Sequence, residues 1–223
     1  MTGLRRGRRG TSRTLPDLSR ERALLRVHGG PVAGVDEAGR GPLAGPVCAA
    51  AVVLDPADVP EGLDDSKKLG AAAREALFDA VLTRAAAVAF AFASPAEIDA
   101  LDVRKATLLA MARAVGALAI RPSAALIDGA DVPPGLDVPA AALIGGDALS
   151  ASIAAASIVA KVARDRLMAR LDARHPGYGF ARHFGYPTAA HRAALAALGP
   201  CAAHRLSFAP VRAAAAAKGL NAR

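Results

Sequence analysis

Two adjacent acids, Asp36 and Glu37, follow an apolar segment (residues 32–35) that has the pattern of a buried strand, and they precede a Gly/Pro turn with one arginine (residues 38–42). Two carboxylates at such a position repel each other and lose hydration, so they need a counter-charge, usually a metal ion. The turn offers backbone N–H groups and a guanidinium, which suit a phosphate. The residues therefore predict a site for a metal ion and a phosphate.

Two more acids stand where strands are expected to end. Asp128 follows the apolar segment 124–127 and precedes a glycine, and Asp147 follows a glycine pair before a long helical pattern. Carboxylates at neighbouring strand ends can converge, and an oxygen-only ligand set suits Mg²⁺ or Mn²⁺ better than zinc. Neighbouring side chains on an ideal strand point to opposite faces, so Asp36 and Glu37 need a local distortion, which the glycine turn could supply. The alternative for Asp128 is an ordinary turn acid, since Asp-Gly is a common turn signal.

These acids belong to an ordered series of motifs. The segment Val35–Pro46 (VDEAGRGPLAGP) resembles the opening motif of bacterial ribonuclease HII. Further matches follow in the same order, namely Leu63–Leu69 (LDDSKKL), Asp128-Gly129, Gly146-Asp147, Ile153–Asp165 (IAAASIVAKVARD), Gly185-Tyr186 and His204–Phe208 (HRLSF). They run from about residue 32 to residue 211, so the resemblance covers nearly the whole chain.

The resemblance implies an α/β chain with the ribonuclease H-like fold, a mixed central sheet flanked by helices and a C-terminal helical extension. It implies an endoribonuclease that hydrolyses the RNA strand of RNA–DNA hybrids. It also implies nicking of duplex DNA on the 5′ side of embedded ribonucleotides, which leaves 5′-phosphate and 3′-hydroxyl ends. The implied chemistry is two-metal-ion hydrolysis with Mg²⁺ or Mn²⁺.

The resemblance also implies roles for particular residues. Asp36, Glu37 and Asp128 become the metal-binding acids, and Asp147 completes the catalytic set. The implied substrate contacts are Gly39, Arg40, Gly41, Ser66, Lys67 and Tyr186. Bare glycine backbone lets a 2′-hydroxyl approach the peptide groups, which is one way for a protein to distinguish RNA from DNA. The alternatives are a solvated charged turn for the 66–68 segment and a partly buried core aromatic for Tyr186.

The chain departs from the family pattern at three positions. Lysine is expected where Gly145 and Phe184 stand, and asparagine is more usual at Asp102. Loss of the two lysines weakens the expected phosphate contacts there. Our hypothesis is that the basic N-terminal arm offsets this loss.

Other polar residues of the motifs carry weaker expectations. Lys161 and Asp165 are spaced to pair along a helix, with Asp165 mainly structural. Arg205 with Ser207 is a candidate contact to the substrate strand. Three histidines, which do not stand at metal-ligand spacing, are expected to pack or to bond the backbone, namely His183, His191 and His204.

Periodicity and punctuation predict one domain with two terminal tails. Residues 1–16 are expected to form a disordered basic tail, residues 17–212 the catalytic domain with its C-terminal helical segment, and residues 213–223 a frayed tail. Within the domain we expect a long helix at 101–120, an irregular loop at 175–187 and a helix at 188–198. The net charge is +8, and residues 1–30 carry eight arginines against two acids, so the tail region holds +6 of it.

Composition bears on the cellular location and on the functional class of the protein. Two cysteines make no disulfide framework, and no stretch of about 20 apolar residues is present, so we expect a cytoplasmic monomer without a membrane segment. The expected partner is nucleic acid. Two alternatives to the nuclease stay open, which are a binding-only protein on a decayed nuclease fold and another enzyme of the same fold, such as a junction resolvase. The four retained acids argue against the first, and the glycine turn with Tyr186 argues against the second.

Overall fold

A five-stranded mixed sheet forms the centre of the structure, a computed structural model that describes residues 15–220. Its strands are β1 (Val32–Ala38), β2 (Val47–Val53), β3 (Ala87–Ala93), β4 (Ala124–Asp128) and β5 (Ala140–Leu143), in the spatial order β3-β2-β1-β4-β5. β1, β2 and β3 pair antiparallel, whereas β4 runs parallel to both β1 and β5. The predicted mixed α/β sheet is confirmed.

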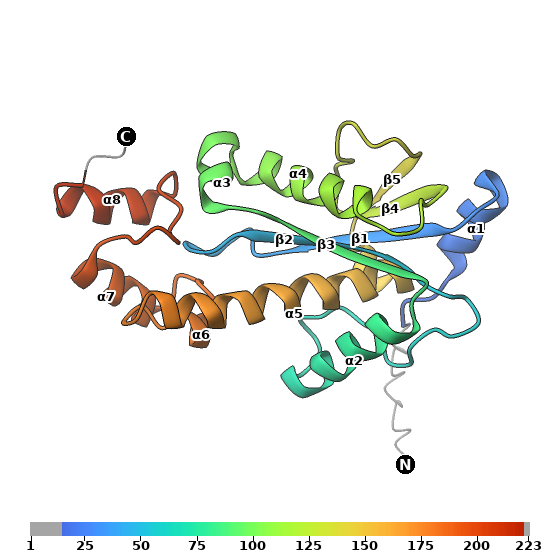
Figure 1. Ribbon diagram of the computed structural model, residues 1–223, viewed down its shortest axis with the longest axis horizontal. Helices are drawn as coiled ribbons and strands as arrows, with labels where there is room; N and C mark the ends of the chain where they lie inside the picture. The colour runs from blue at the N-terminus through green and yellow to red at the C-terminus, as the bar shows by residue number, and fades with distance from the viewer. Residues whose placement is uncertain (1–14, 221–223) are drawn as a thin grey trace, which may run out of the picture.

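Helices cover both faces of this sheet (Figure 1). One face carries α5 (Ala151–Arg174) and α2 (Ala71–Arg84), and the other carries α3 (Pro95–Leu101) and α4 (Val103–Gly116). Each layer encloses its own apolar core. The alanine-rich buried face of α5 lets its backbone come close to β1, where a Cβ on Gly34 would lie 2.2 Å from the carbonyl carbon of Ser152. This close packing joins the start of α5 to the strand that leads to Asp36 and Glu37.

The two ends of the molecule carry smaller helices. Helix α1 (Ser19–His28) lies beside the start of β1, and α6 (Phe180–His183), α7 (Ala189–Leu198) and α8 (Ala209–Ala217) gather at the opposite end (Figure 1). Helix α6 falls within the segment expected to be an irregular loop. Within residues 15–220 no helix has both the length and the apolar character needed to span a membrane.

The chain stays ordered beyond residue 212, where the domain was expected to end. Helix α8 continues to Ala217 and buries Val211 and Ala215, and Val211 packs in one apolar cluster with Leu43 and Leu195. Most of the expected basic tail, residues 1–14, lies outside the described residues, as do residues 221–223.

The expected helix at 101–120 is wrong in its boundaries, because the chain breaks at Asp102. This residue has a φ of 76°, and its carboxylate caps α4 by accepting a hydrogen bond from the Lys105 N–H at 2.9 Å. Asparagine adopts positive φ more readily than most residues and also caps helices well, which explains physically why it would suit this position. Ser94 forms a capping box with Glu97 at the start of α3, and Thr188 caps α7 through the His191 N–H.

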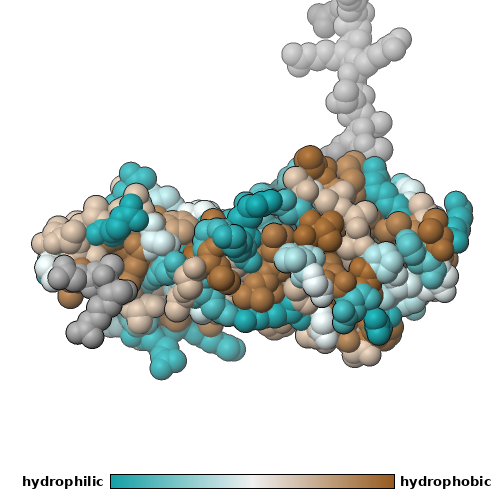
Figure 2. Space-filling model, turned by 90° about the horizontal axis from the view of Figure 1, so that it is seen from above, coloured by the Kyte–Doolittle hydropathy of each residue, from teal (hydrophilic) through white to brown (hydrophobic). Residues whose placement is uncertain are grey.

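The surface seen from above mixes hydrophilic and hydrophobic residues along its length (Figure 2). Scattered apolar residues are normal on a protein surface and carry no special meaning. The site is therefore sought in specific polar side chains.

Candidate active site

Three carboxylates meet at the ends of two adjacent strands. Asp36 and Glu37 lie near the end of β1 and Asp128 ends β4, and one oxygen from each lies within 4.8 Å of the others. We call these three residues the acidic cluster. Within residues 15–220 it is the one group of three or more His, Cys, Asp or Glu side chains close enough to share a metal ion. Carboxylate oxygens are the donors that Mg²⁺ and Mn²⁺ prefer, so the residues fit such an ion.

Strand pairing explains how the cluster forms. β1 and β4 run parallel with Val35 beside Ile127, so the next residues, Asp36 and Asp128, emerge side by side. The β1–β2 ladder continues in register through Asp36 and Glu37, so the distortion that we expected is not seen in that ladder. The ladder with β4 instead stops at Val35, just before the two acids. The acidic cluster thus forms where the hydrogen-bonded ladder between β1 and β4 ends.

The electrostatics of the cluster favour a cation. Burial raises the pKa of Asp36 well above its usual range, and the carboxylates of Glu37 and Asp128 raise it further. Burial also raises the pKa of Glu37, against the lowering effect of the Arg40 guanidinium, whose Nη1 lies 3.5 Å from Glu37 Oε1. These raised pKa values reflect the free-energy cost of burying ionised carboxylates next to one another. A bound cation would reduce that cost.

Asp147 lies beside the cluster and outside it. It sits on a short 3₁₀ turn (Gly146–Ala148), is 8% exposed, and its Oδ2 lies 3.7 Å from Lys67 Nζ. Burial raises the pKa of Asp147, and the charges of Asp65 and Asp128 add to this effect. Burial alone would lower the pKa of the Lys67 ammonium, but the surrounding carboxylates outweigh it and raise that pKa. Lys67 is therefore a protonated, mostly exposed cation at the rim of the acids.

The glycine turn is held from behind by two buried arginines. Arg205 donates hydrogen bonds to the carbonyls of Gly39, Arg40 and Gly45, and Arg164 donates to the carbonyls of Ala44, Pro46 and Phe184. Both side chains are about 1% exposed or less. The turn is thus a rigid loop with its exposed Arg40 side chain facing outward.

The expectation that the Arg205 side chain contacts substrate is wrong, because Arg205 is fully buried beneath the turn. Ser207 is exposed, and its hydroxyl donates to Asp99 Oδ1 at 2.6 Å. Neither anchoring role was visible in the sequence, because Arg205 bonds residues about 165 positions earlier in the chain. The pairing of Lys161 with Asp165 is confirmed, with Nζ–oxygen distances of 2.6 and 2.7 Å.

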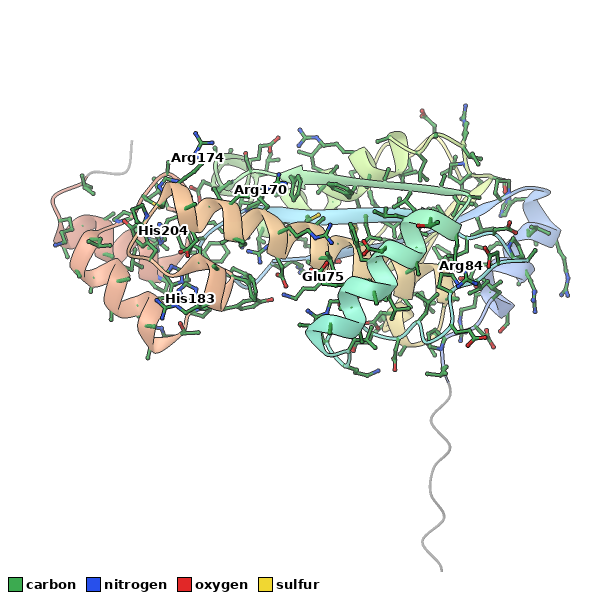
Figure 3. All side chains as sticks on the ribbon, turned by 60° about the horizontal axis from the view of Figure 1, so that its bottom comes forward. Glu75, Arg84, Arg170, Arg174, His183 and His204 are labelled. Atoms are coloured by element: carbon green, nitrogen blue, oxygen red, sulfur yellow. The ribbon has the colours of Figure 1, made fainter. Side chains whose placement is uncertain are left out.

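Tyr186 lies next to the glycine turn. The residue is 42% exposed, and a Cβ built on Gly41 would lie 3.9 Å from its Cε1 atom. Its loop is pinned by Leu43, whose N–H donates to the Gly185 carbonyl at 2.8 Å, and by His183, which accepts from the Gly185 N–H at 3.2 Å. Figure 3 shows His183 with His204 at this end of the molecule, beside the C-terminal half of α5.

Ser66 and the two positions where lysine was expected do not present a charged side chain of their own to the acidic cluster. The Ser66 side chain is buried, and its hydroxyl accepts a hydrogen bond from Ser157 on α5, so it supports its loop from within. Phe184, at the position where lysine was expected, has a φ of 50° and packs under the Lys161 ammonium, which lies 4.7 Å from the ring centroid. Lys161 thus places a cation close to where the missing lysine would stand. Gly145 has a φ of 66°, which favours glycine.

The mixed sheet and the acidic cluster together define a metal-dependent nuclease of the ribonuclease H-like class. The structure is similar to ribonuclease H2 from Pyrococcus horikoshii, with a TM-score of 0.73 and 28% identity over 86% of this chain and 100% of that one. The family model for ribonuclease HII matches residues 33–211. The chain belongs to the ribonuclease HII family.

Sequence relatives agree with this assignment, and a more distant structure shares the fold. The chain is 58% identical to ribonuclease HII of Brucella ovis over 198 residues, which cover 88% of this chain and 90% of that protein. It is 59% identical to ribonuclease HII of Rhizobium leguminosarum over 198 residues, 89% of this chain and 86% of that one. A ribonuclease HIII (Bst) solved in complex with Mn²⁺ shares the fold, with a TM-score of 0.65 and 21% identity over 84% of this chain and 70% of that one.

Family membership gives the activity. Ribonuclease HII is a metal-dependent endoribonuclease (EC 3.1.26.4) that cleaves RNA in RNA–DNA hybrids and at embedded ribonucleotides, and this chain is an enzyme of that kind. The acidic cluster supplies a set of carboxylates that could bind the metal.

Proposed function

We propose that Asp36, Glu37 and Asp128 hold the divalent ions of this nuclease and that Asp147 completes the catalytic set. The supporting observation is the convergence of three carboxylates within 4.8 Å, buried enough for their pKa values to rise. Two ions of Mg²⁺ or Mn²⁺ would activate the attacking water and stabilise the leaving 3′ oxygen, which gives 5′-phosphate and 3′-hydroxyl ends.

The protein's own groups then bind and orient the substrate. Lys67, 78% exposed beside Asp147, is placed to contact a backbone phosphate near the acids. The exposed Arg40 guanidinium offers a second phosphate contact, and it lies 3.5 Å from Glu37. Arg205 holds the carbonyls of Gly39 and Arg40, and the bare backbone of this turn would admit a 2′-hydroxyl. A side chain at Gly41 would narrow that space, whereas a side chain at Gly39 would instead meet the buried Arg164 guanidinium.

Tyr186 extends this surface beyond the glycine turn. Its exposed ring lies next to Gly41, so a sugar that follows the ribonucleotide would rest on it. This arrangement favours a nick on the 5′ side of a single embedded ribonucleotide, at a junction with DNA. A cytoplasmic, monomeric enzyme remains part of the same proposal.

The deciding experiment is cleavage of a labelled DNA duplex with one ribonucleotide, in Mg²⁺, Mn²⁺ or EDTA. We expect one nick on the 5′ side of the ribonucleotide, abolished by EDTA. Asp36→Asn should slow cleavage by about a hundredfold or more while keeping the fold and much of the hybrid binding, because it removes a charged ligand from the cluster.

Asp137→Asn, at an exposed acid in a surface loop, is the matched control and should cut at the wild-type rate. Cleavage by Asp36→Asn at the wild-type rate with Mg²⁺ would refute the metal assignment. Binding of the duplex by the wild-type protein without any cleavage would favour the binding-only alternative.

A further inference from the structure

Glu21 is a buried acid at the far end of β1 from the acidic cluster. It lies on α1, is 8% exposed, and one of its oxygens, Oε1, accepts three hydrogen bonds from the first residues of α5. These bonds come from Ser150 Oγ at 2.6 Å, Ser152 N at 2.9 Å and Ser152 Oγ at 2.6 Å. The other oxygen is buried without a partner. A buried carboxylate with one unpaired oxygen lowers stability relative to a fully bonded group, so its position needs a physical explanation.

Two residues near Glu21, Arg20 on α1 and Asp17 just before it, bind the same short segment. Arg20 Nη1 donates to the Leu149 carbonyl at 2.7 Å, and the Ala151 N–H donates to the Asp17 carbonyl at 2.9 Å. Together with the bonds to Glu21, every residue from 149 to 152 is tied to the N-terminal end of α1. This segment joins the turn that carries Asp147 to α5.

The segment 149–152 is linked to Asp128 through Gly146. The Ser150 N–H donates to the Gly146 carbonyl at 2.8 Å, and the Gly146 N–H donates to Asp128 Oδ1 at 2.7 Å. Asp147 is the next residue along the chain. Two hydrogen bonds that share the residue Gly146 therefore connect Ser150 to Asp128. Ser150 is also a partner of Glu21, and the turn that contains Gly146 carries Asp147.

The first turn of α5 also packs closely on the sheet. A Cβ on Gly34 would lie 2.2 Å from the carbonyl carbon of Ser152 and 2.3 Å from the Ile153 nitrogen, so α5 already touches β1 there. Glu21 binds the same turn through Ser150 and Ser152. The start of α5 is thus held by contacts with both a strand and a buried carboxylate.

We infer that Glu21 is a positioning residue, which fixes the 146–150 turn and thereby sets the places of Asp147 and Asp128. The inference rests on the roles proposed above for those two acids. Helix α1 precedes residue 33, where the match to the family model begins, so Glu21 itself lies outside the matched segment.

The test compares Glu21→Ala with Glu21→Gln, and with Val27→Ala as the matched control. Val27 is 74% exposed on the same helix. We expect Glu21→Ala to lower kcat by about tenfold with little change in KM, because displacement of a catalytic group impairs the transition state more than substrate binding. Glu21→Gln keeps an amide oxygen for the same three donors and should restore most of kcat, and Val27→Ala should match the wild type.

Hydrogen exchange of the backbone amides of residues 146–150 gives a readout independent of activity. These amides should exchange faster in Glu21→Ala and stay protected in Glu21→Gln. Unchanged protection or unchanged kcat in Glu21→Ala would overturn the inference. Equal losses in both variants would also overturn it, since the hydrogen bonds would then not be the cause.

A double-mutant cycle with Asp147→Asn, measured under single-turnover conditions, separates this inference from the proposed function. If Glu21 acts through Asp147, Glu21→Ala should slow the Asp147→Asn enzyme much less than it slows the wild type. A full additive loss would contradict the inference. Asp147→Asn alone at the wild-type rate would instead refute the proposed role of Asp147, while the exchange data would still report whether Glu21 holds the turn.

Discussion

The ring of Tyr186 is left free while its backbone is firmly held. Its carbonyl accepts hydrogen bonds from His191 Nδ1 at 2.9 Å and from the Thr188 N–H at 2.8 Å, and its own N–H donates to the His183 carbonyl. The residue is 42% exposed, and its ring lies beside Gly41. A rigid backbone with an exposed aromatic ring suits stacking on a sugar or base, because little entropy is lost when the ligand binds. The exposed fraction also argues against a core aromatic.

At this residue scale we predict that Tyr186→Ala lowers kcat/KM on the single-ribonucleotide duplex by about tenfold, the value of one lost aromatic contact. A continuous hybrid, which does not need the junction contact, should lose clearly less. Tyr186→Phe keeps the ring and serves as the control, with near wild-type rates on both substrates. Parallel measurements of kcat/KM on the two substrates decide the matter, and equal losses would make Tyr186 a packing residue.

At the scale of elements, three histidines tie the C-terminal helices to the Tyr186 loop. The Cys201 N–H donates to His204 Nδ1 at 3.0 Å, so the proton of that ring must lie on Nε2. His204 Nε2 then donates to His191 Nε2 at 3.1 Å, and His191 Nδ1 donates to the Tyr186 carbonyl. His183 stacks on His191 with a centroid distance of 4.5 Å. The expectation that each histidine bonds the backbone is confirmed, but their meeting in space was not predicted.

This chain of bonds works only while both rings of the His191–His204 pair are neutral. Burial lowers the pKa of His204 to about 4, and the neighbouring His191 lowers it further, while burial also lowers the pKa of His191. A second proton on either ring would place two N–H groups face to face. The unfolded chain takes up a proton on His204 below its ordinary pKa of 6.5, whereas the folded protein resists until about pH 4. The unfolded state therefore binds more protons in this window.

We predict that the stability contributed by His204 is fully present above pH 6.5 and is lost as the pH falls towards 4. The whole effect corresponds to roughly 3 kcal/mol. Urea unfolding at a series of pH values measures it as the difference between wild type and His204→Asn, whose stability should depend less on pH. His28→Gln, at an exposed histidine, should keep the wild-type dependence. An identical pH dependence in wild type and His204→Asn would contradict the prediction.

At the scale of the whole molecule, most of the net positive charge lies in the first 30 residues of the sequence. Residues 1–30 supply +6 of the net +8, so the remainder of the chain, which includes the acidic cluster, carries only +2. Most of the N-terminal arginines fall in residues 1–14, outside the described part of the chain. Attraction of a nucleic acid by such charges weakens as salt rises, because condensed counterions are released on binding.

We predict that deleting residues 1–16, with its five arginines, raises KM at physiological salt and flattens the dependence of KM on salt, with kcat unchanged. Each arginine that contacts a phosphate should contribute about 0.9 to the slope of log affinity against log salt. Replacing the same five arginines with lysine keeps the charge and should keep the slope. An unchanged slope after the deletion would end the idea that this segment offsets the missing lysines.

The sequence by itself determined which acids follow expected strands. Continuous apolar runs precede Asp36 and Asp128, so a buried strand that ends at each acid can be inferred from a local pattern. The parallel pairing of β1 with β4, which brings these acids together, was decided by the tertiary structure. Helix caps at Ser94 and Thr188 are likewise local patterns, because a cap depends on residues only three positions apart. Periodicity and capping act over a few residues, so both can be inferred from the chain alone.

Only the tertiary structure decided which buried polar groups support those acids. Arg205 holds a turn about 165 residues away, and Glu21 reaches serines about 130 residues away. Such contacts depend on how whole helices pack and on the rotamer that each long side chain adopts, and neither leaves a local pattern. The same reason explains why Ser66 turned inward, why the helix expected at 101–120 broke at Asp102, and why the three histidines met.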